Sequence, residues 1–308
     1  MTRAVVFAYH NVGVRCLKVL LAQGVDIALI FTHDDNPAEQ IWFDRVAALA
    51  TDYGIPAITP DDPNTPELLQ QIRDLKPDFL FSFYYRKMLS LELLAIAPQG
   101  ALNMHGSLLP KYRGRVPVNW AIIHGETETG ATLHYMVEKP DAGDTVGQTA
   151  VPILPDDMAG EVFNKVTLAA ELTLHRILPA LITGNAPRIV QDLSQGSYFT
   201  GRKPEDGRID WNWPVQRIHN LVRAVAPPYP GAFTTVNGRL VRILRSRIIE
   251  LNMQTRIAPQ LELIDGHLIA HCVGGGLLQI LALDIAGSLV IPAELADLIG
   301  PSPWQLGD

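Results

Sequence analysis

An amide and an imidazole end the short apolar segment 100–105, GALNMH, and a basic loop follows them. Asn103 and His105 are two residues apart, so on a strand both side chains point to the same face. The amide can donate a hydrogen bond to a developing oxyanion, and the imidazole can transfer a proton near neutral pH. The pair taken alone fits equally well a turn that is capped by polar side chains.

Asp141, in the segment PDAGDTVG, is the third candidate for this chemistry. A carboxylate beside an imidazole favours the protonated ring and fixes its orientation. Gly143 and Gly147 allow the loop to bend tightly. Asp144 is the rival for the same role, and an ordinary Asx turn is the alternative interpretation of the loop.

Alternating strands and helices are expected to position these residues. Strands are predicted over 4–8, 26–32, 56–59, 78–83 and 100–105, and helices over 14–24, 37–54, 65–75, 90–98, 116–125 and 158–181. This alternation predicts a mostly parallel α/β sheet. The first strand is followed by AYHNVG rather than G-x-G-x-x-G, which disfavours an NAD-type site. Ligands of such sheets still bind beyond the carboxyl ends of the strands.

The pattern changes after residue 187. Short alternating runs, separated by Gly, Pro and Asn, predict a small β-barrel. We therefore expect an α/β protein with two domains, a catalytic domain over 1–189 and a barrel over 190–308.

Composition describes a globular protein with a large core. Of 308 residues, 47% are hydrophobic and 19% are charged, and the net charge of -7 opposes nucleic-acid binding. Cys16 and Cys272 are too few for a disulfide framework. No signal peptide or membrane span is predicted, so a cytoplasmic location is the default. No metal motif is present, and the remaining histidines are scattered without a predicted role: His10, His33, His124, His134, His175, His219, His267 and His271.

Several basic and aromatic residues are weaker candidates for ligand binding. Lys111, Arg113 and Arg115 place positive charge on the loop after His105, where they could hold anions or simply face solvent. The aromatic residues of FSFYYRKML, 81–89, could stack on a flat ring or belong to the core. In the second half, Arg202, Lys203 and Arg223 could contact phosphates, and Tyr229 and Phe233 could stack on a base; the alternative is a proline-rich turn before a strand.

The combined pattern resembles the folate-dependent formyltransferase family. The segment LNMHGSLLPKYRGRVPVNWAIIHGETETGATLHYMVEKPDAGD is similar to the core signature of that family, with its Asn, His and Asp in the same order. VVFAYHNVG, IFTHDDNP, FSFYYR and LVRAV…PYPGAF resemble the formyltransferase domain of the bifunctional enzyme that processes UDP-4-amino-4-deoxy-L-arabinose. The resemblance covers most of the first 240 residues and becomes vague in the C-terminal strands.

This resemblance implies a Rossmann-like N-terminal domain, an OB-like C-terminal barrel and 10-formyltetrahydrofolate as the formyl donor. It implies that Asn103, His105 and Asp141 are catalytic. For the folate it points to Lys87, Met88, Leu89, Arg115, Val137, Glu138, Lys139 and Pro140. We assign the acceptor side to Tyr9, Arg202, Lys203, Arg223, Tyr229 and Phe233. Where two arginines are expected after segment 198–201, this chain has Arg202 and Lys203, and a lysine cannot make the same bidentate phosphate contact.

The activity implied is N-formylation of the 4-amino group of UDP-4-amino-4-deoxy-L-arabinose, in lipid A modification and polymyxin resistance. Alternatives are another nucleotide-linked amino sugar, methionyl-tRNA, a non-catalytic binder, and hydrolysis of the formyl donor. Residues 201–308 contain ten Lys/Arg and ten Asp/Glu, whereas a tRNA-binding barrel should be basic. We expect folate and a nucleotide sugar as partners, and no metal, nucleic acid or membrane. The sequence leaves open homo-oligomer formation and whether a decarboxylase domain belongs to the same protein.

Overall fold

The computed structural model describes residues 1–36, 41–251 and 258–306. The chain forms two compact units. The first unit contains Met1–Pro117, Glu128–Pro152 and Asn164–Thr200, and the second contains Val118–Thr127, Ile153–Phe163 and Gly201–Asp308. The predicted domain bounds, 1–189 and 190–308, stay a prediction.

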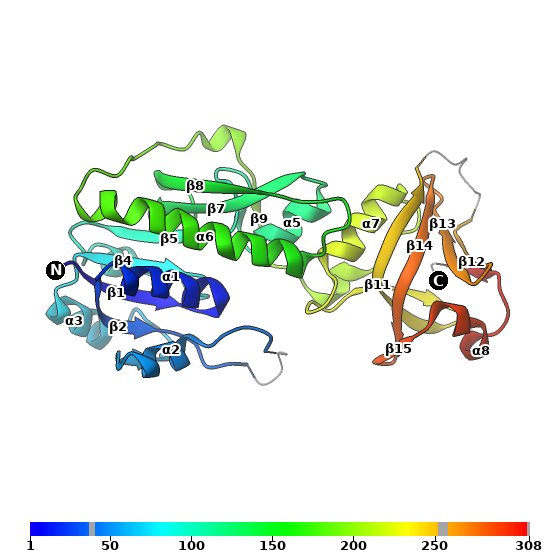
Figure 1. Ribbon diagram of the computed structural model, residues 1–308, viewed down its shortest axis with the longest axis horizontal. Coiled ribbons are helices and arrows are strands. Elements are labelled where there is room, and N and C mark those ends of the chain that lie inside the picture. The colour runs from blue at the N-terminus through cyan, green and yellow to red at the C-terminus, as the bar shows by residue number, and fades with distance from the viewer. Residues whose placement is uncertain (37–40, 252–257, 307–308) are drawn as a thin grey trace. The chain divides into compact units, whose positions relative to one another are not determined.

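A mostly parallel sheet forms the centre of the first unit. Its strands have the order β3-β2-β1-β4-β5-β7-β8 (Figure 1). The parallel strands are β1 (Arg3–Ala8), β2 (Asp26–Phe31), β3 (Ala57–Ile58), β4 (Phe79–Phe83) and β5 (Ala101–His105), whereas β7 (Glu128–Tyr135) and β8 (Thr145–Pro152) are antiparallel. β1 and β4 are almost entirely buried, as expected for central strands covered on both faces. This confirms the predicted Rossmann-like sheet.

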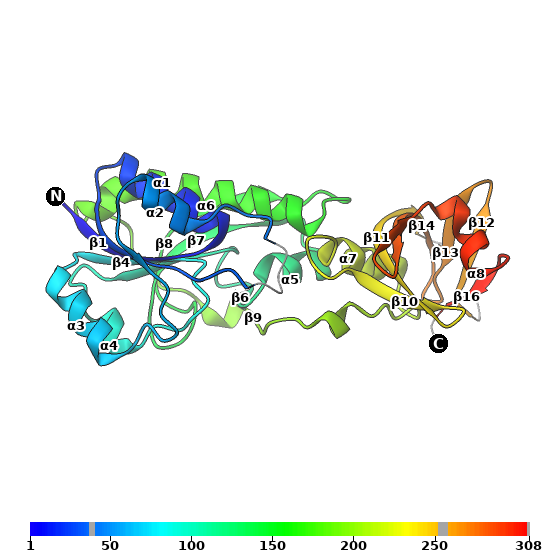
Figure 2. The same ribbon diagram turned by 90° about the horizontal axis from the view of Figure 1, so that it is seen from below.

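Helices cover both faces of this sheet. Figure 2 shows α1 (His10–Ala22) and the first-unit part of α6 (Ala159–Ile182) on one face, and α3 (Pro66–Leu75) and α4 (Leu91–Leu94) on the other. On the second face, Phe7 and Leu80 of the sheet belong to one core cluster with Ile72 of α3 and Leu93 of α4. The change of face between β1 and β4 creates the switch point at which α/β sheets bind ligands.

Two helices are shorter than the sequence predicted. The helix expected over 37–54 begins only at Val46, as α2 (Val46–Asp52), and residues 37–40 lie outside the described part of the chain. Phe43 instead stacks on the His10 ring, with centroids 3.8 Å apart, so tertiary packing outweighs the helical pattern there. Over 90–98 only one turn forms, as α4, and the Ser90 side chain caps it by accepting from the Leu93 N–H.

The second unit contains an antiparallel sheet that curls into a barrel-like shape (Figure 1). The strand order is β10-β11-β14-β13-β12-β16, with β15 beside β14. The bounds are β10 (Ala232–Val236), β11 (Arg239–Glu250), β12 (Gln260–Ile264), β13 (His267–His271), β14 (Leu277–Ile285), β15 (Ser288–Val290) and β16 (Trp304–Gln305). Trp211 and Trp304 belong to its core, together with α7 (Val215–Ala224) and α8 (Leu295–Ile299). The predicted OB-like barrel is confirmed.

Candidate functional site

Asn103 and His105 lie at the carboxyl end of β5, on the same side of the strand. β7 runs antiparallel beside β5, and its His134 lies directly opposite Asn103. The chain leaves β7 through residues 136–144 and returns as β8, and Asp141 in this loop has a φ of 53°. An aspartate adopts this left-handed conformation more readily than most residues do. The turn brings its carboxylate back against the end of β5.

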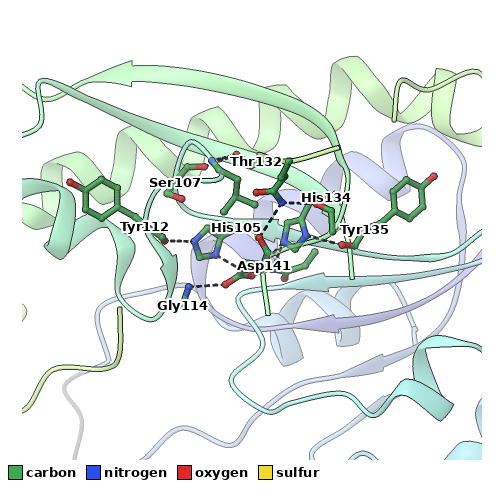
Figure 3. Close-up of polar contacts among 12 residues, drawn as sticks. His105, Ser107, Tyr112, Gly114, Thr132, His134, Tyr135 and Asp141 are labelled. Atoms are coloured by element: carbon green, nitrogen blue, oxygen red, sulfur yellow. Dashed lines mark hydrogen bonds and ion pairs between the residues drawn. The ribbon is translucent and has the colours of Figure 1, made fainter. Parts of the chain in front are cut away.

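The Asp141 carboxylate lies among four other polar groups of the site (Figure 3). Its Oδ1 is 3.5 Å from His105 Nδ1, 3.5 Å from His134 Nε2 and 3.4 Å from Asn103 Nδ2. Its Oδ2 accepts a hydrogen bond of 2.9 Å from the Gly114 N–H. The structure therefore brings together the three residues that the sequence proposed, and it adds His134 and a backbone N–H.

The Asp141 carboxyl group is held in its ionised form. Burial opposes ionisation, but the charge of His105, the neighbouring His134 ring and the hydrogen bond from the Gly114 N–H outweigh it, and the pKa falls well below its ordinary value. Asp141 therefore supplies a permanent negative charge to the two histidines at neutral pH. The rival, Asp144, accepts from Arg188 Nε at 2.7 Å instead.

The His105 ring is anchored by a backbone carbonyl as well as by the carboxylate. Its Nε2 lies 2.8 Å from the Tyr112 carbonyl oxygen, which can only accept, so this nitrogen carries a proton (Figure 3). The ring is only 6% exposed. The other nitrogen, Nδ1, faces Asp141 at 3.5 Å, too long for a good hydrogen bond but close enough for charge attraction. The two ring nitrogens of His105 thus face a backbone carbonyl and a carboxylate.

The loop that supplies these backbone groups, residues 106–114, is tied to β7 and β8 by buried hydrogen bonds. The Thr132 hydroxyl donates to the Ser107 carbonyl at 2.6 Å and accepts from the Leu109 N–H at 3.2 Å. Gln148 donates to the Leu109 carbonyl at 2.7 Å. At the far end of the loop, β6 (Arg113–Gly114) pairs with β9 (Tyr198–Phe199). These contacts hold the Tyr112 carbonyl and the Gly114 N–H in place.

The residues predicted to bind the folate lie in two stretches of the first unit. The Lys87 ammonium donates to the Pro60 and Asp61 carbonyls, at 2.6 Å and 2.5 Å, so it holds backbone rather than facing outward. Met88 is 67% exposed and Val137 44% exposed. The neighbours Glu138, Lys139 and Arg115 are also exposed, while Leu89 and Pro140 are half-buried. Met88 and Val137 thus offer exposed apolar surface of the kind that a flat ligand can contact. The folate assignments remain predictions.

The residues predicted to bind the acceptor differ in their environments. Tyr9 is buried at the end of β1 and donates to Asp35 at 3.1 Å. Arg202 lies over the Trp120 ring, 4.9 Å from its centroid, and Lys203 is exposed. Tyr229 and Phe233 are half-buried, and burial raises the pKa of Tyr229 to about 12, with a smaller opposing effect from Asn119.

Arg223 is deeply buried in this structure, and its predicted contact with a phosphate stays a prediction. It is 5% exposed, and its guanidinium donates to the Leu154 and Asp157 carbonyls and to Asn220 Oδ1. The guanidinium therefore satisfies two backbone carbonyl groups in the segment that precedes α6. In this structure Arg223 therefore stabilises segment 154–157.

Sequence reasoning missed His134, which it placed among the scattered histidines. Its ring is 1% exposed and lies between Asn103 and Asp141. The only signal was the pattern ATLHYM, a strand with a histidine in it. Recognising its place required the register of β7 against β5, which no local pattern specifies. Gln191 was also missed; it donates to the Asp141 carbonyl at 3.1 Å.

Comparison with known proteins identifies the family of this chain. A family model described as formyl transferase matches residues 11–178, and one described as formyl transferase, C-terminal domain matches residues 202–296. The chain therefore belongs to the formyl transferase family.

Solved structures share the fold at low sequence identity. The N-formyltransferase from Helicobacter canadensis, described with folinic acid and dTDP-3-aminofucose, has 20% identity and a TM-score of 0.71 over 91% of this chain and 99% of its own. WlaRD, a sugar 3N-formyl transferase described with dTDP and 5-N-formyl-THF, has 18% identity and a TM-score of 0.71 over 94% and 99%. A sugar N-formyltransferase from Shewanella sp FDAARGOS_354 has 18% identity and a TM-score of 0.65 over 81% and 100%.

Within residues 1–36, 41–251 and 258–306, no helix has both the length and the apolar character needed to cross a membrane. The same residues contain no group of three or more His, Cys, Asp or Glu side chains placed to hold a metal ion. The expectation that the protein needs no metal stays a prediction.

Proposed function

We propose that this protein transfers the formyl group of 10-formyltetrahydrofolate to the 4-amino group of UDP-4-amino-4-deoxy-L-arabinose. The observation that carries the proposal is the gathering of Asn103, His105 and an ionised Asp141 at the end of β5. Membership of the formyl transferase family supports the reaction type. The fold is shared with sugar N-formyltransferases that are described with a folate and a dTDP-sugar or dTDP, which supports a nucleotide sugar as acceptor.

The site has the groups that this transfer needs. The sugar amine attacks the formyl carbon and forms a C–N bond, and the carbonyl oxygen becomes an oxyanion. An Asn103 N–H and the protonated ring of His105 stabilise that charge. The C–N bond to the folate nitrogen then breaks, the amine loses a proton and the departing nitrogen gains one. His105 Nδ1 is placed to carry that proton, directly or through a water, because Nε2 is occupied by the Tyr112 carbonyl.

The Asp141 carboxylate lies beside His105 and orients its ring, while the Tyr112 carbonyl fixes the plane of the ring. The two contacts divide a task that a single carboxylate performs in many histidine-based sites. The attacking amine must be uncharged, so activity should fall at acid pH even though Asp141 remains ionised.

The specific sugar rests on the resemblance of VVFAYHNVG, IFTHDDNP and FSFYYR to the arabinose-processing enzyme. Arg202 over Trp120 and the exposed Lys203 are the cations that we assign to the diphosphate. An acceptor of this class implies a role in lipid A modification and polymyxin resistance.

The test is an acceptor panel. The protein is incubated with 10-formyltetrahydrofolate and UDP-4-amino-4-deoxy-L-arabinose, a dTDP-3-amino sugar, methionyl-tRNA or no acceptor, and the products are identified by mass spectrometry. The proposal expects N-formylated UDP-sugar as the fastest product. Preference for the dTDP-sugar would retain the reaction and replace the sugar, and formate released equally without acceptor would refute the transfer.

A further inference from the structure

His134 is buried between two of the residues to which we assign the chemistry. It lies on β7, directly opposite Asn103, and its ring is 1% exposed. Its Nε2 is 3.2 Å from Asn103 Nδ2 and 3.5 Å from Asp141 Oδ1, while its Nδ1 is 2.9 Å from the Tyr135 carbonyl oxygen (Figure 3). No substrate is expected to reach a ring that is so deeply enclosed. Any influence on catalysis must pass through Asn103 or Asp141.

The hydrogen-bond partners determine which atoms carry protons. The Asp141 carboxylate only accepts, so the Asn103 amide must turn its NH₂ group toward it, at 3.4 Å. The same nitrogen also faces His134, so His134 Nε2 accepts and carries no proton. The Tyr135 carbonyl likewise only accepts, so the ring proton of His134 is on Nδ1. The arrangement is self-consistent only when His134 is neutral.

This arrangement also determines where the second amide hydrogen points. His134 Nε2 and Asp141 Oδ1 are 3.5 Å from each other, on one side of the Asn103 nitrogen. The two N–H bonds of an amide point in different directions. His134 Nε2 and Asp141 Oδ1 therefore share one amide hydrogen of Asn103. The second N–H is then directed away from both acceptors, and we assign it to the oxyanion.

Protonation of His134 would disturb all three residues. Its Nε2 would become a donor, would repel the Asn103 NH₂ group and would bind the Asp141 carboxylate. His105 also depends on that carboxylate, at 3.5 Å, and the two imidazole rings are 6.5 Å apart. The titratable side chains that face His134 are those of Asp141 and His105. On β8, the residue paired with His134 is Thr145, which is uncharged. One carboxylate cannot serve two imidazolium ions equally well.

We infer that His134 is a positioning residue whose neutral, Nδ1-protonated ring orients the Asn103 amide toward the oxyanion and leaves Asp141 to His105. This inference rests on the proposed function, because it concerns the same site. The reacting groups remain those assigned above. The inference adds that His134 stays uncharged beside His105.

Substitution separates this role from ordinary packing. His134→Leu removes the acceptor, so we expect kcat to fall roughly 10- to 100-fold with the KM of each substrate nearly unchanged. His134→Gln keeps an uncharged acceptor that does not titrate. We expect it to recover most of kcat, with the KM of each substrate again nearly unchanged. His175→Leu, on the exposed face of α6, is the control and should leave kcat and KM unchanged.

A second measurement does not depend on turnover. Nitrogen-15 NMR of the full chain should show His134 as the neutral Nδ1–H tautomer at pH 7.5. An Nε2–H or doubly protonated ring would overturn the inference, and so would a His134→Gln variant as impaired as His134→Leu. If no acceptor is formylated by the wild type, the proposed function fails, while the NMR result still decides the state of His134.

Discussion

At the scale of single residues, Asp141 controls how the site responds to acid. Its pKa is lower in the folded protein than the value of about 3.9 expected in the unfolded chain. The ionised carboxylate therefore contributes stability that is fully present above that unfolded value and is lost as pH falls below it. We predict that the difference in unfolding free energy between the wild type and Asp141→Asn shrinks below about pH 4. Urea unfolding at several pH values measures it, and a constant difference would contradict the assignment.

His10 also makes stability depend on pH. Unlike Asp141, its charged form is a cation. Burial, assisted by the charge of Arg86, lowers its pKa to about 3, so the folded protein keeps this ring neutral. The unfolded chain takes up the proton below about pH 6.5, so stability falls as pH drops through that value. Between pH 7 and pH 5 the loss from His10 should be about 2 kcal/mol.

A His10→Phe variant isolates this contribution, because the ring already stacks on Phe43. The comparison uses the change in unfolding free energy from pH 7 to pH 5 within each protein, so that a general packing cost cancels. We expect the change to be smaller in the variant. An equal change in both proteins would show that His10 does not titrate in this way.

At the scale of elements, the loop 106–114 is the part that must not move. The Thr132 hydroxyl links it to β7 through the Ser107 carbonyl and the Leu109 N–H. Thr132→Val keeps the shape and removes the hydroxyl, which should cost about 1–3 kcal/mol of stability. Because His105 and Asp141 depend on this loop, we also expect kcat to fall roughly tenfold or more.

Thr173→Val is the matched control for that experiment. Thr173 is also fully buried, and its hydroxyl donates to Thr149 at 2.6 Å, away from the loop. It should lower the melting temperature without changing kcat. If both variants lower kcat to the same extent, the effect of Thr132 is general destabilisation and not loop placement.

Elements are also where sequence reasoning succeeded and where it stopped. The strands, the long helix α6 and the class of both domains could be predicted, because buried parallel strands and a 3.6-residue period leave strong local patterns. Asn103, His105 and Asp141 could be proposed from their types and order. The pairing of His134 with Asn103 could not be predicted, because the register of β7 against β5 is a tertiary property. The late start of α2 at Val46 likewise follows from the stacking of Phe43 on His10.

At the scale of the whole molecule, charge separates the possible acceptors. The net charge is -7, and residues 201–308 carry equal numbers of basic and acidic residues. Binding to tRNA depends on cations that release counterions from phosphates. We predict no retention on immobilised tRNA at about 0.1 M salt. Salt-sensitive retention would instead favour methionyl-tRNA as the acceptor.

The measurement that tests the central claim most directly is single-turnover formyl transfer by the wild type and by His105→Asn, with product detected by mass spectrometry and folate binding measured in parallel. The account predicts that the variant binds the folate as the wild type does, because His105 is not among the residues that we assign to folate binding. It also predicts a loss in rate of about 10²-fold or more, the range typical of a missing proton carrier. A variant that forms product at the wild-type rate would show that His105 does not carry the proton.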